Sequence, residues 1–226
     1  LNKINFFLVI TQTSPLNFPS LSNILQKNFS IPENAFVLDI NLGCSGYVYA
    51  LKLAESLMLT GGFKNGIILT VDTYTKFISK KNKSCYPIFS DACTVTILKK
   101  NLKKNKFHYH FGSDGSGSKD LYLKKKDKDM FMNGANVALF TFKVIPNFVN
   151  NFINLNSYNK KDFKYFLFHQ ASKFVCDNIN QRLILNKDQI YNNYQKYGNT
   201  ISSSIPLLLM DLFNKKLLKK SDQLIL

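Results

Sequence analysis

The sequence of 226 residues predicts an α/β protein in which strands and helices form layers. Two observations support this fold class. Segments with strand-like and helix-like patterns alternate over the first 72 residues, which is typical of α/β domains. The segment 66–72 is short and mostly apolar, like a strand covered on both faces of its sheet. With 45% hydrophobic residues, the chain can bury a sizeable core as one large or two small domains.

The elements expected in the first part of the chain follow from the spacing of apolar residues and from the positions of glycine and proline. A buried strand is expected over residues 5–11, and a short helix begins close to Pro19. A further strand, helix, strand and strand are expected over 35–40, 47–60, 66–72 and 94–98. The lysine-rich stretch 99–106 is expected to form an exposed turn or sheet edge.

The second part of the chain continues with the same two kinds of element. Residues 107–111 alternate like a strand, which would place His108 and His110 on one face. Because no third ligand follows them, no metal site is expected. The remaining elements are a helix over 130–152 that ends or kinks near Pro146, strands over 165–168 and 223–226, and helices over 173–183 and from 202–206 onward.

Charge and composition limit the classes of partner. The chain has 30 basic and 14 acidic residues, a net charge of +16, but Arg182 is its only arginine. Arginine is the preferred reader of base edges, and no nucleic-acid-binding motif is present, so nucleic acid is not expected as a partner. The excess lysine is either solvated or attracts an acidic protein. No apolar run could span a membrane and no signal peptide is visible, so a cytoplasmic protein is expected.

Cys44 lies in a glycine-flanked turn between an expected strand and an expected helix. The unpaired N–H groups and positive dipole end of a helix favour an anion, so the pKa of this thiol is expected to be lowered. Cys44 is therefore a candidate nucleophile, although a buried structural cysteine is an alternative. The other three cysteines, Cys85, Cys93 and Cys176, show no zinc-ligand spacing and are expected to fill the core or loops.

Two further motifs fall at the ends of elements. His169 follows the expected strand 165–168, and ligands collect at the carboxyl ends of strands in open α/β sheets. Asn199 lies in a Tyr-Gly-Asn-Thr turn before the helix that contains Pro206. Each motif alone is also typical of structural residues.

Taken together and in this order, the three motifs resemble those of the β-ketoacyl-acyl-carrier-protein synthase III family of the thiolase superfamily. The resemblance covers essentially the whole chain, including Phe18-Pro19-Ser20, the turn 113–117 and Met132-Asn133-Gly134. It implies a thiolase-like fold of two duplicated, layered α-β-α-β-α halves. It places Cys44 in a half that covers 1–105, and the His169 and Asn199 motifs in a second half that covers 106–226.

The resemblance implies a Cys-His-Asn acyltransferase that works in two stages without a cofactor. Cys44 would take an acyl group from acyl-CoA, with its backbone N–H in an oxyanion hole. His169 and Asn199 would then hydrogen-bond the thioester carbonyl of malonyl-acyl carrier protein. They would stabilise the enolate that forms on decarboxylation and attacks the acyl-cysteine, in fatty acid or related lipid or polyketide biosynthesis.

The resemblance also implies roles outside the catalytic set. Phe18 would reach across a homodimer interface to the partner's acyl pocket, although it is equally interpreted as core. Ser172 stands where the family has asparagine, within the expected substrate-binding region. Lys173 is the lysine expected nearest the pocket mouth, where the acidic acyl carrier protein would bind. The family has a glycine-rich turn at the position of residues 89–93, whereas this sequence has no glycine in that segment.

Relative to the family, the chain is expected to be a fragment. It begins after the N-terminal elements that bind CoA, which leaves the first half incomplete, and it ends before the glycine-rich strand that completes the oxyanion hole. Two other functions are compatible with the sequence. One is acyl transfer by the same cysteine to an acceptor other than a malonyl thioester, and the other is non-catalytic binding of a carrier protein.

Overall fold

The computed structural model describes residues 1–101, 107–124 and 126–226. The chain forms two compact units that interleave along the sequence. The first unit contains residues 1–73, 91–107 and 200–207, and the second contains 74–90, 108–199 and 208–226. The duplication into halves 1–105 and 106–226 stays a prediction. Most of the lysine-rich turn expected over 99–106 lies outside the described residues.

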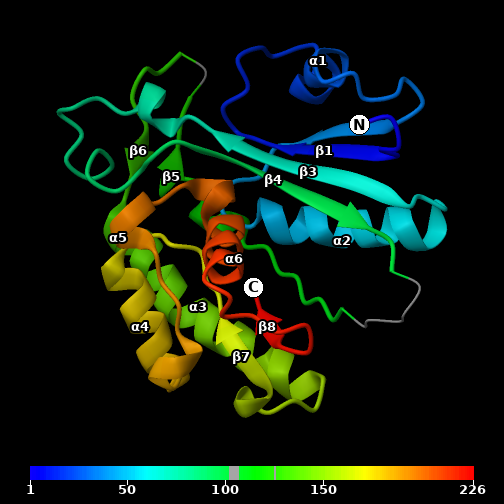
Figure 1. The fold of residues 1–226 in the computed structure, drawn as a ribbon. Helices are drawn as coiled ribbons and strands as arrows, with labels where there is room; N and C mark the ends of the chain where they lie inside the picture. Colours follow the sequence, from blue (N-terminus) through cyan, green and yellow to red (C-terminus); the bar gives the residue numbers. More distant parts are fainter. Residues whose placement is uncertain (102–106, 125) are drawn as a thin grey trace. The chain divides into compact units, whose positions relative to one another are not determined.

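The first unit is organised around a four-stranded mixed sheet (Figure 1). Its strands are β1 (Phe6–Ile10), β2 (Phe36–Ile40), β3 (Asn65–Asp72) and β4 (Ala92–Lys99), in the order β2-β1-β3-β4. Strand β1 pairs in parallel with both β2 and β3, and β4 is antiparallel to β3. The four strands expected from the sequence are confirmed, and the carboxyl ends of the three parallel strands share one edge.

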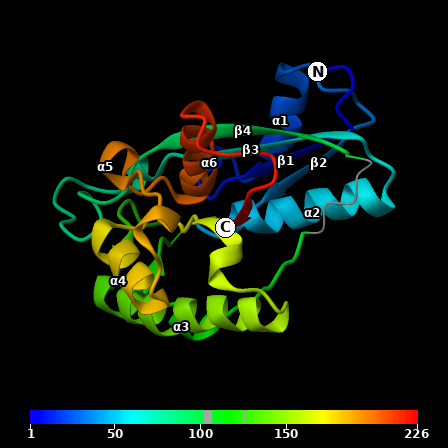
Figure 2. The same cartoon turned by 60° about the horizontal axis from the view of Figure 1, so that its bottom comes forward.

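Two helices cover opposite faces of this sheet, which gives the layered arrangement (Figures 1 and 2). They are α1 (Leu21–Asn28) and α2 (Gly46–Thr60). Every residue of β1 is buried, because the central strand is covered on both faces. The 3-10 helix η5 (Ile201–Ser203) belongs to the same unit, and the hydroxyls of Ser203 and Thr70 lie 2.7 Å apart.

The second unit has helices and short strands around its own apolar core. Its long helices α3 (Gly134–Leu155) and α4 (Lys173–Leu183) pack side by side (Figure 2). The parallel pair β7 (Phe163–Phe166) and β8 (Gln223–Ile225) adds Phe166 and Ile225 to their core. The shorter elements are β5 (Leu121–Tyr122), β6 (Phe131–Met132), α5 (Tyr194–Tyr197), η1 (Tyr74–Phe77), η2 (Gly115–Gly117), η3 (Lys160–Asp162) and η4 (Lys187–Gln189). Helix α6 (Ser204–Asn214) begins in the first unit and ends in the second.

The structure tests three sequence expectations about this unit. Residues 107–111 do not form a strand, because side-chain contacts hold the segment instead: His108 Nδ1 lies 2.6 Å from Asn156 Oδ1, and the ring of His110 packs on that of Phe148. Helix α3 starts at Gly134, within the stretch expected to hold it, and the Asn133 side chain caps its start. Of the two alternatives expected at Pro146, an end of the helix is wrong, because the helix continues to Leu155, and a kink stays a prediction.

The strand expected over 165–168 also begins earlier, at Phe163. Its pairing continues past β7, since the Leu167 N–H donates to the Ile225 carbonyl at 2.8 Å. In the parts of the chain that the structure describes, no helix has the length and apolar character needed to cross a membrane.

Candidate active site

Cys44 occupies a tight elbow between β2 and α2. The Gly46 N–H donates to the Gly43 carbonyl at 2.9 Å, which closes the turn around Cys44. A Cβ on Gly46 would lie 2.5 Å from Ile10 Cγ2, so only glycine lets the helix start this close to β1. Ser45 is the N-cap of α2, and its side chain makes no cap hydrogen bond. The strand, elbow and helix expected around Cys44 are therefore confirmed.

The thiol at this elbow is not a lowered-pKa thiolate, and that expectation is wrong. Burial of the sulfur disfavours the charged form and raises the pKa of Cys44 to about 12. The residue's own N–H lowers the pKa, but this smaller effect is outweighed, and the nearby Asp72 carboxylate raises the pKa further. The residue as a whole nevertheless has solvent-exposed surface. At neutral pH, Cys44 is a protonated thiol.

Asp72 is a buried carboxylate at the end of β3 in the same unit. Its oxygens accept hydrogen bonds from the Gln12 N–H at 2.9 Å and from the Ser202 hydroxyl. Burial raises the pKa of Asp72, and these hydrogen bonds partly offset the shift. Asp72 thus joins the segment after β1 to η5, and the side chains of Gln12 and Ile201 from those segments border Gly43.

His169 follows β7 in the second unit, on the short connection to α4. Both of its ring nitrogens are buried. Its carbonyl accepts the Ala171 N–H at 3.0 Å and lies 3.7 Å from the Cys176 thiol. Burial raises the pKa of Cys176 to about 11, so this thiol stays neutral and can donate. The strand-to-helix placement expected for His169 is confirmed.

Asn199 is buried in the same unit, and its backbone is fixed like that of a strand residue. The Asn199 N–H donates to the Ile88 carbonyl at 3.0 Å, and the Asn199 carbonyl accepts the Ser90 N–H at 2.9 Å. Gly198 precedes it with φ of +69°, and an added Cβ would lie 3.0 Å from Ser90 Oγ. Glycine is therefore needed in the turn that presents Asn199.

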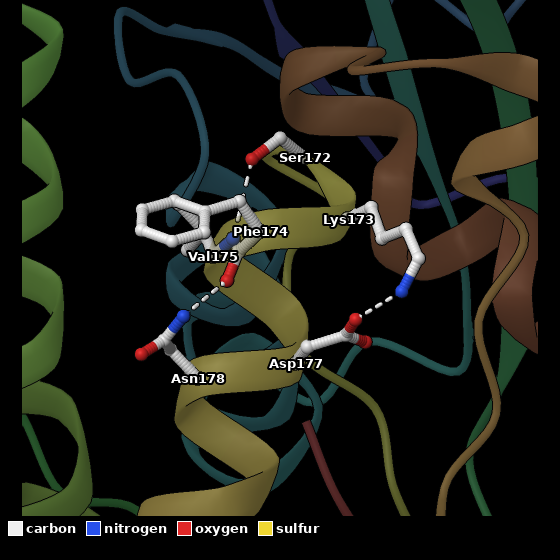
Figure 3. Close-up of polar contacts among 6 residues, drawn as sticks. All are labelled: Ser172, Lys173, Phe174, Val175, Asp177 and Asn178. Atoms are coloured by element: carbon white, nitrogen blue, oxygen red, sulfur yellow. Dashed lines mark hydrogen bonds and ion pairs between the residues drawn. The ribbon is translucent and has the colours of Figure 1, made fainter.

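Ser172 and Lys173 lie at the start of α4, where both make local contacts (Figure 3). Ser172 is the N-cap, and its hydroxyl accepts the Val175 N–H at 3.2 Å. The Lys173 ammonium pairs with the Asp177 carboxylate one turn along the helix. The hydrogen bond that this ammonium donates to the carboxylate raises the pKa of Lys173. Both side chains thus have structural partners, and their substrate-binding roles stay predictions.

Phe18 lies in the first unit and is 83% exposed. Its interpretation as a core residue is therefore wrong. Its contribution to a partner's acyl pocket stays a prediction.

The candidate residues thus form two groups: Cys44 in the first unit, and His169 and Asn199 in the second. Sequence reasoning missed the polar residues that support them, among which Asp72 could have been found as a carboxylate at the same sheet edge as Cys44. Within the described ranges, no cluster of three or more His, Cys, Asp or Glu side chains could hold a metal ion.

Comparison with known protein families gives matches in both parts of the chain. The family model of 3-oxoacyl-[acyl-carrier-protein] synthase III matches residues 38–115, and the model of its C-terminal part matches residues 153–226. A β-ketoacyl-[acyl-carrier-protein] synthase III from Staphylococcus saprophyticus is 30% identical over all of this chain and 72% of its own length. One from Caldanaerobacter subterraneus is 29% identical over 97% of this chain and 70% of its own.

Solved structures of enzymes with this name have the same fold. A crystal structure of a 3-oxoacyl-(acyl-carrier-protein) synthase III superposes with a TM-score of 0.94 and 28% identity, over 99% of this chain and 74% of that one. The synthase III from Thermus thermophilus superposes with a TM-score of 0.91 and 25% identity, over 98% and 72%. The fold is therefore that of the thiolase-like condensing enzymes, as the sequence predicted.

Proposed function

This chain belongs to the 3-oxoacyl-[acyl-carrier-protein] synthase III family of condensing acyltransferases, and we propose that Cys44, His169 and Asn199 carry out its two chemical stages. One observation carries the assignment of residues. Cys44 lies within the segment that the first family model matches, and His169 and Asn199 lie within the segment that the second matches. Cys44 and His169 sit on connections after the strands β2 and β7, and Asn199 follows the short helix α5. Backbone hydrogen bonds fix all three segments.

In the first stage, Cys44 accepts the acyl group of an acyl-CoA. The sulfur attacks the thioester carbonyl, a new carbon–sulfur bond forms, and the bond to CoA breaks. Because the resting thiol is protonated, it must lose its proton as the sulfur attacks. The departing CoA thiolate takes up a proton and leaves as CoA–SH. The Cys44 N–H at the elbow supports the oxyanion of the tetrahedral intermediate.

In the second stage, His169 and Asn199 bind the thioester carbonyl of malonyl-acyl carrier protein. Loss of carbon dioxide leaves an enolate, whose negative oxygen accepts hydrogen bonds from the imidazole N–H and the amide N–H. The enolate carbon attacks acyl-Cys44, and the intermediate collapses to a 3-oxoacyl thioester and the Cys44 thiolate. Neutral donors suit this step, because a carboxylate would repel the enolate.

The two substrates supply everything that this reaction needs, so we propose no cofactor and no metal. An activity that survives dialysis against a strong chelator is expected, and its loss would contradict this part of the proposal. The acidic carrier protein is the proposed macromolecular partner, since a net charge of +16 attracts an acidic surface.

The proposed enzyme is a cytoplasmic homodimer. All four cysteines lie in described segments and are free thiols, as expected in a reducing compartment. The exposed Phe18 supports a second copy as its partner. Sedimentation should then give twice the chain mass, and a Phe18→Ser variant should shift the equilibrium toward monomer; a monomeric parent chain would contradict the dimer.

The direct test is acylation of Cys44. The purified chain is incubated with acetyl-CoA and with longer acyl-CoAs, and adducts are located by intact-mass and peptide mass spectrometry. An acyl group confined to Cys44, and absent from a Cys44→Ser control, is expected. Addition of malonyl-acyl carrier protein should then convert the adduct to a 3-oxoacyl product. A folded chain that forms no adduct would refute the proposed role of Cys44.

A further inference from the structure

A chain of buried and partly buried hydrogen bonds joins the segment of His169 to the segment of Asn199 inside the second unit. It begins at Gln170, the residue after His169, which is 1% exposed. The Gln170 amide nitrogen donates to the Phe168 carbonyl at 2.8 Å, and its amide oxygen accepts the Asn193 N–H at 3.0 Å. One side chain therefore holds the backbone on the N-terminal side of His169 and also the start of α5.

The next link is the Asp211 carboxylate on α6, which is also buried. One oxygen accepts the Asn193 amide N–H at 3.1 Å, and the other accepts the Tyr197 hydroxyl at 3.2 Å. Asn193 and Tyr197 stand at the two ends of the short helix α5, so a single carboxylate fastens both ends. Because hydrogen bonds to a charged acceptor are about twice as strong as neutral ones, Asp211 is the main anchor.

Tyr197 leads directly to Asn199. Its carbonyl accepts a hydrogen bond from the Ser90 hydroxyl, and the Ser90 N–H donates to the Asn199 carbonyl. Gly198 lies between them in a conformation that side chains disfavour, so the turn depends on its neighbours to hold its shape. The segment of Asn199 is thus fixed by Ser90 on one side and by Asp211, through Tyr197, on the other.

We propose that Asp211 is a positioning residue that sets the geometry between His169 and Asn199, and that Gln170 and Asn193 relay its effect. This inference rests on the proposed function, because the two residues need to converge on one thioester oxygen. Misplacement of reacting groups by about 1 Å can cost on the order of 100-fold in rate. Acylation of Cys44 does not depend on these two donors, so the effect should be confined to the second stage.

The test compares both stages in an Asp211→Asn variant. The amide offers one acceptor and one donor, so either Asn193 or Tyr197 loses its acceptor while the side-chain volume stays nearly the same. Condensation and malonyl-thioester decarboxylation should fall in kcat by about 10-fold to 100-fold. Acylation of Cys44 by acetyl-CoA should stay within about twofold of the parent rate. Asp188→Asn, at an exposed carboxylate of the same unit, is the matched control and should change neither stage.

A double variant, Asp211→Asn with Asn193→Asp, exchanges the amide and the carboxylate of this hydrogen-bonded pair. The amide at position 211 can then donate to the carboxylate at position 193. The double variant should recover condensation to within about threefold of the parent, which a merely structural role for the Asp211 charge would not produce. If Asp211→Asn does not fold, Tyr197→Phe removes one donor alone and should still lower the kcat of condensation several-fold with acylation unchanged.

Three results would overturn the inference: parent-like condensation in folded Asp211→Asn, equal loss of both stages, or no recovery in the folded double variant. A parent chain that neither acylates nor decarboxylates would instead refute the proposed function, so the two failures are distinguishable.

Discussion

The Cys44 elbow and the His169–Asn199 segments are held in place by different means. At the elbow, close backbone packing dominates: Gly46 approaches the Ile10 side chain, and the turn closes by a main-chain hydrogen bond. Around His169 and Asn199, side chains such as Gln170 and Asp211 connect segments far apart in the sequence. The nucleophile therefore depends on the sheet and helix beside it, and the two donors depend on a polar network.

This difference has a mechanistic consequence. A nucleophile at a closely packed turn needs only one reacting atom in place, whereas two donors that share one oxygen need a fixed spacing between them. The first stage should therefore tolerate changes in the polar network of the second unit, and the second stage should tolerate loss of the thiol.

The largest expected effect is complete separation of the two stages. Cys44→Ala should form no acyl adduct and no 3-oxoacyl product, because the proposed acyl acceptor is the sulfur of Cys44. It should still decarboxylate malonyl-acyl carrier protein. His169→Ala should keep the adduct and lose decarboxylation by about 100-fold to 1,000-fold, as expected for loss of an oxyanion donor. Mass spectrometry follows the adduct, and release of carbon dioxide follows the second stage.

Asn199→Ala is the matched variant for the second stage and should resemble His169→Ala. If Cys44→Ala lost decarboxylation as fully as His169→Ala does, the second stage would depend on Cys44 as well as on His169 and Asn199. The proposed separation of the two stages would then be wrong.

The second effect concerns the stability of the elbow. Gly46→Ala places a Cβ 2.5 Å from Ile10 Cγ2, so β1 or α2 must shift. Overpacking of this kind costs about 1–3 kcal/mol in the free energy of unfolding. Urea denaturation measures the loss, and Gly115→Ala is the control, since a Cβ there meets nothing within 4 Å. Equal stability of the two variants would show that close packing does not fix the elbow.

The third effect is on the reactivity of Cys44. Because its pKa is raised to about 12, the thiolate fraction should grow about tenfold per pH unit between pH 7 and pH 9, with no plateau. Alkylation by iodoacetamide, measured on the Cys44 peptide, should follow that slope. Asp72→Asn removes a negative charge that raises this pKa, so alkylation at a fixed pH should become about two- to fivefold faster.

Cys93 provides the internal control in the same samples. Its pKa is also raised by burial, but without a contribution from Asp72, so its alkylation rate should not respond to Asp72→Asn. A Cys44 plateau below pH 8 would mean that the helix terminus dominates after all.

The sequence predicted the elements around Cys44 well because their signals are local. The apolar run of β2, the glycines of the turn and the helical spacing of α2 all lie within 30 residues. The pKa of Cys44 could not be predicted in the same way. It depends on burial in the folded unit and on the charge of Asp72, which is 28 positions away in the sequence.

The hydrogen bonds that hold the segments of His169 and Asn199 could not be predicted from the sequence, for the same reason. Gln170 and Tyr197 were visible in their motifs, but their link through Asp211 requires α6 to pack beside α5. The strand expected over residues 107–111 shows the converse error. Its alternating pattern is a local signal, yet ring packing by His110 determines the observed conformation.

The smallest effect is expected at Lys173, which is exposed and already paired with Asp177 on its own helix. Lys173→Ala removes one positive charge from a chain of +16 and leaves the fold and the acylation of Cys44 unchanged. The KM for malonyl-acyl carrier protein should rise by no more than about twofold at low salt and not at all near 0.5 M salt, because exposed charges act at long range and are screened. Lys220→Ala is the exposed control and should behave alike if only net charge matters. A rise of tenfold that persists at high salt would instead identify Lys173 as a direct contact of the carrier protein, and the start of α4 would then bind substrate as well as support His169.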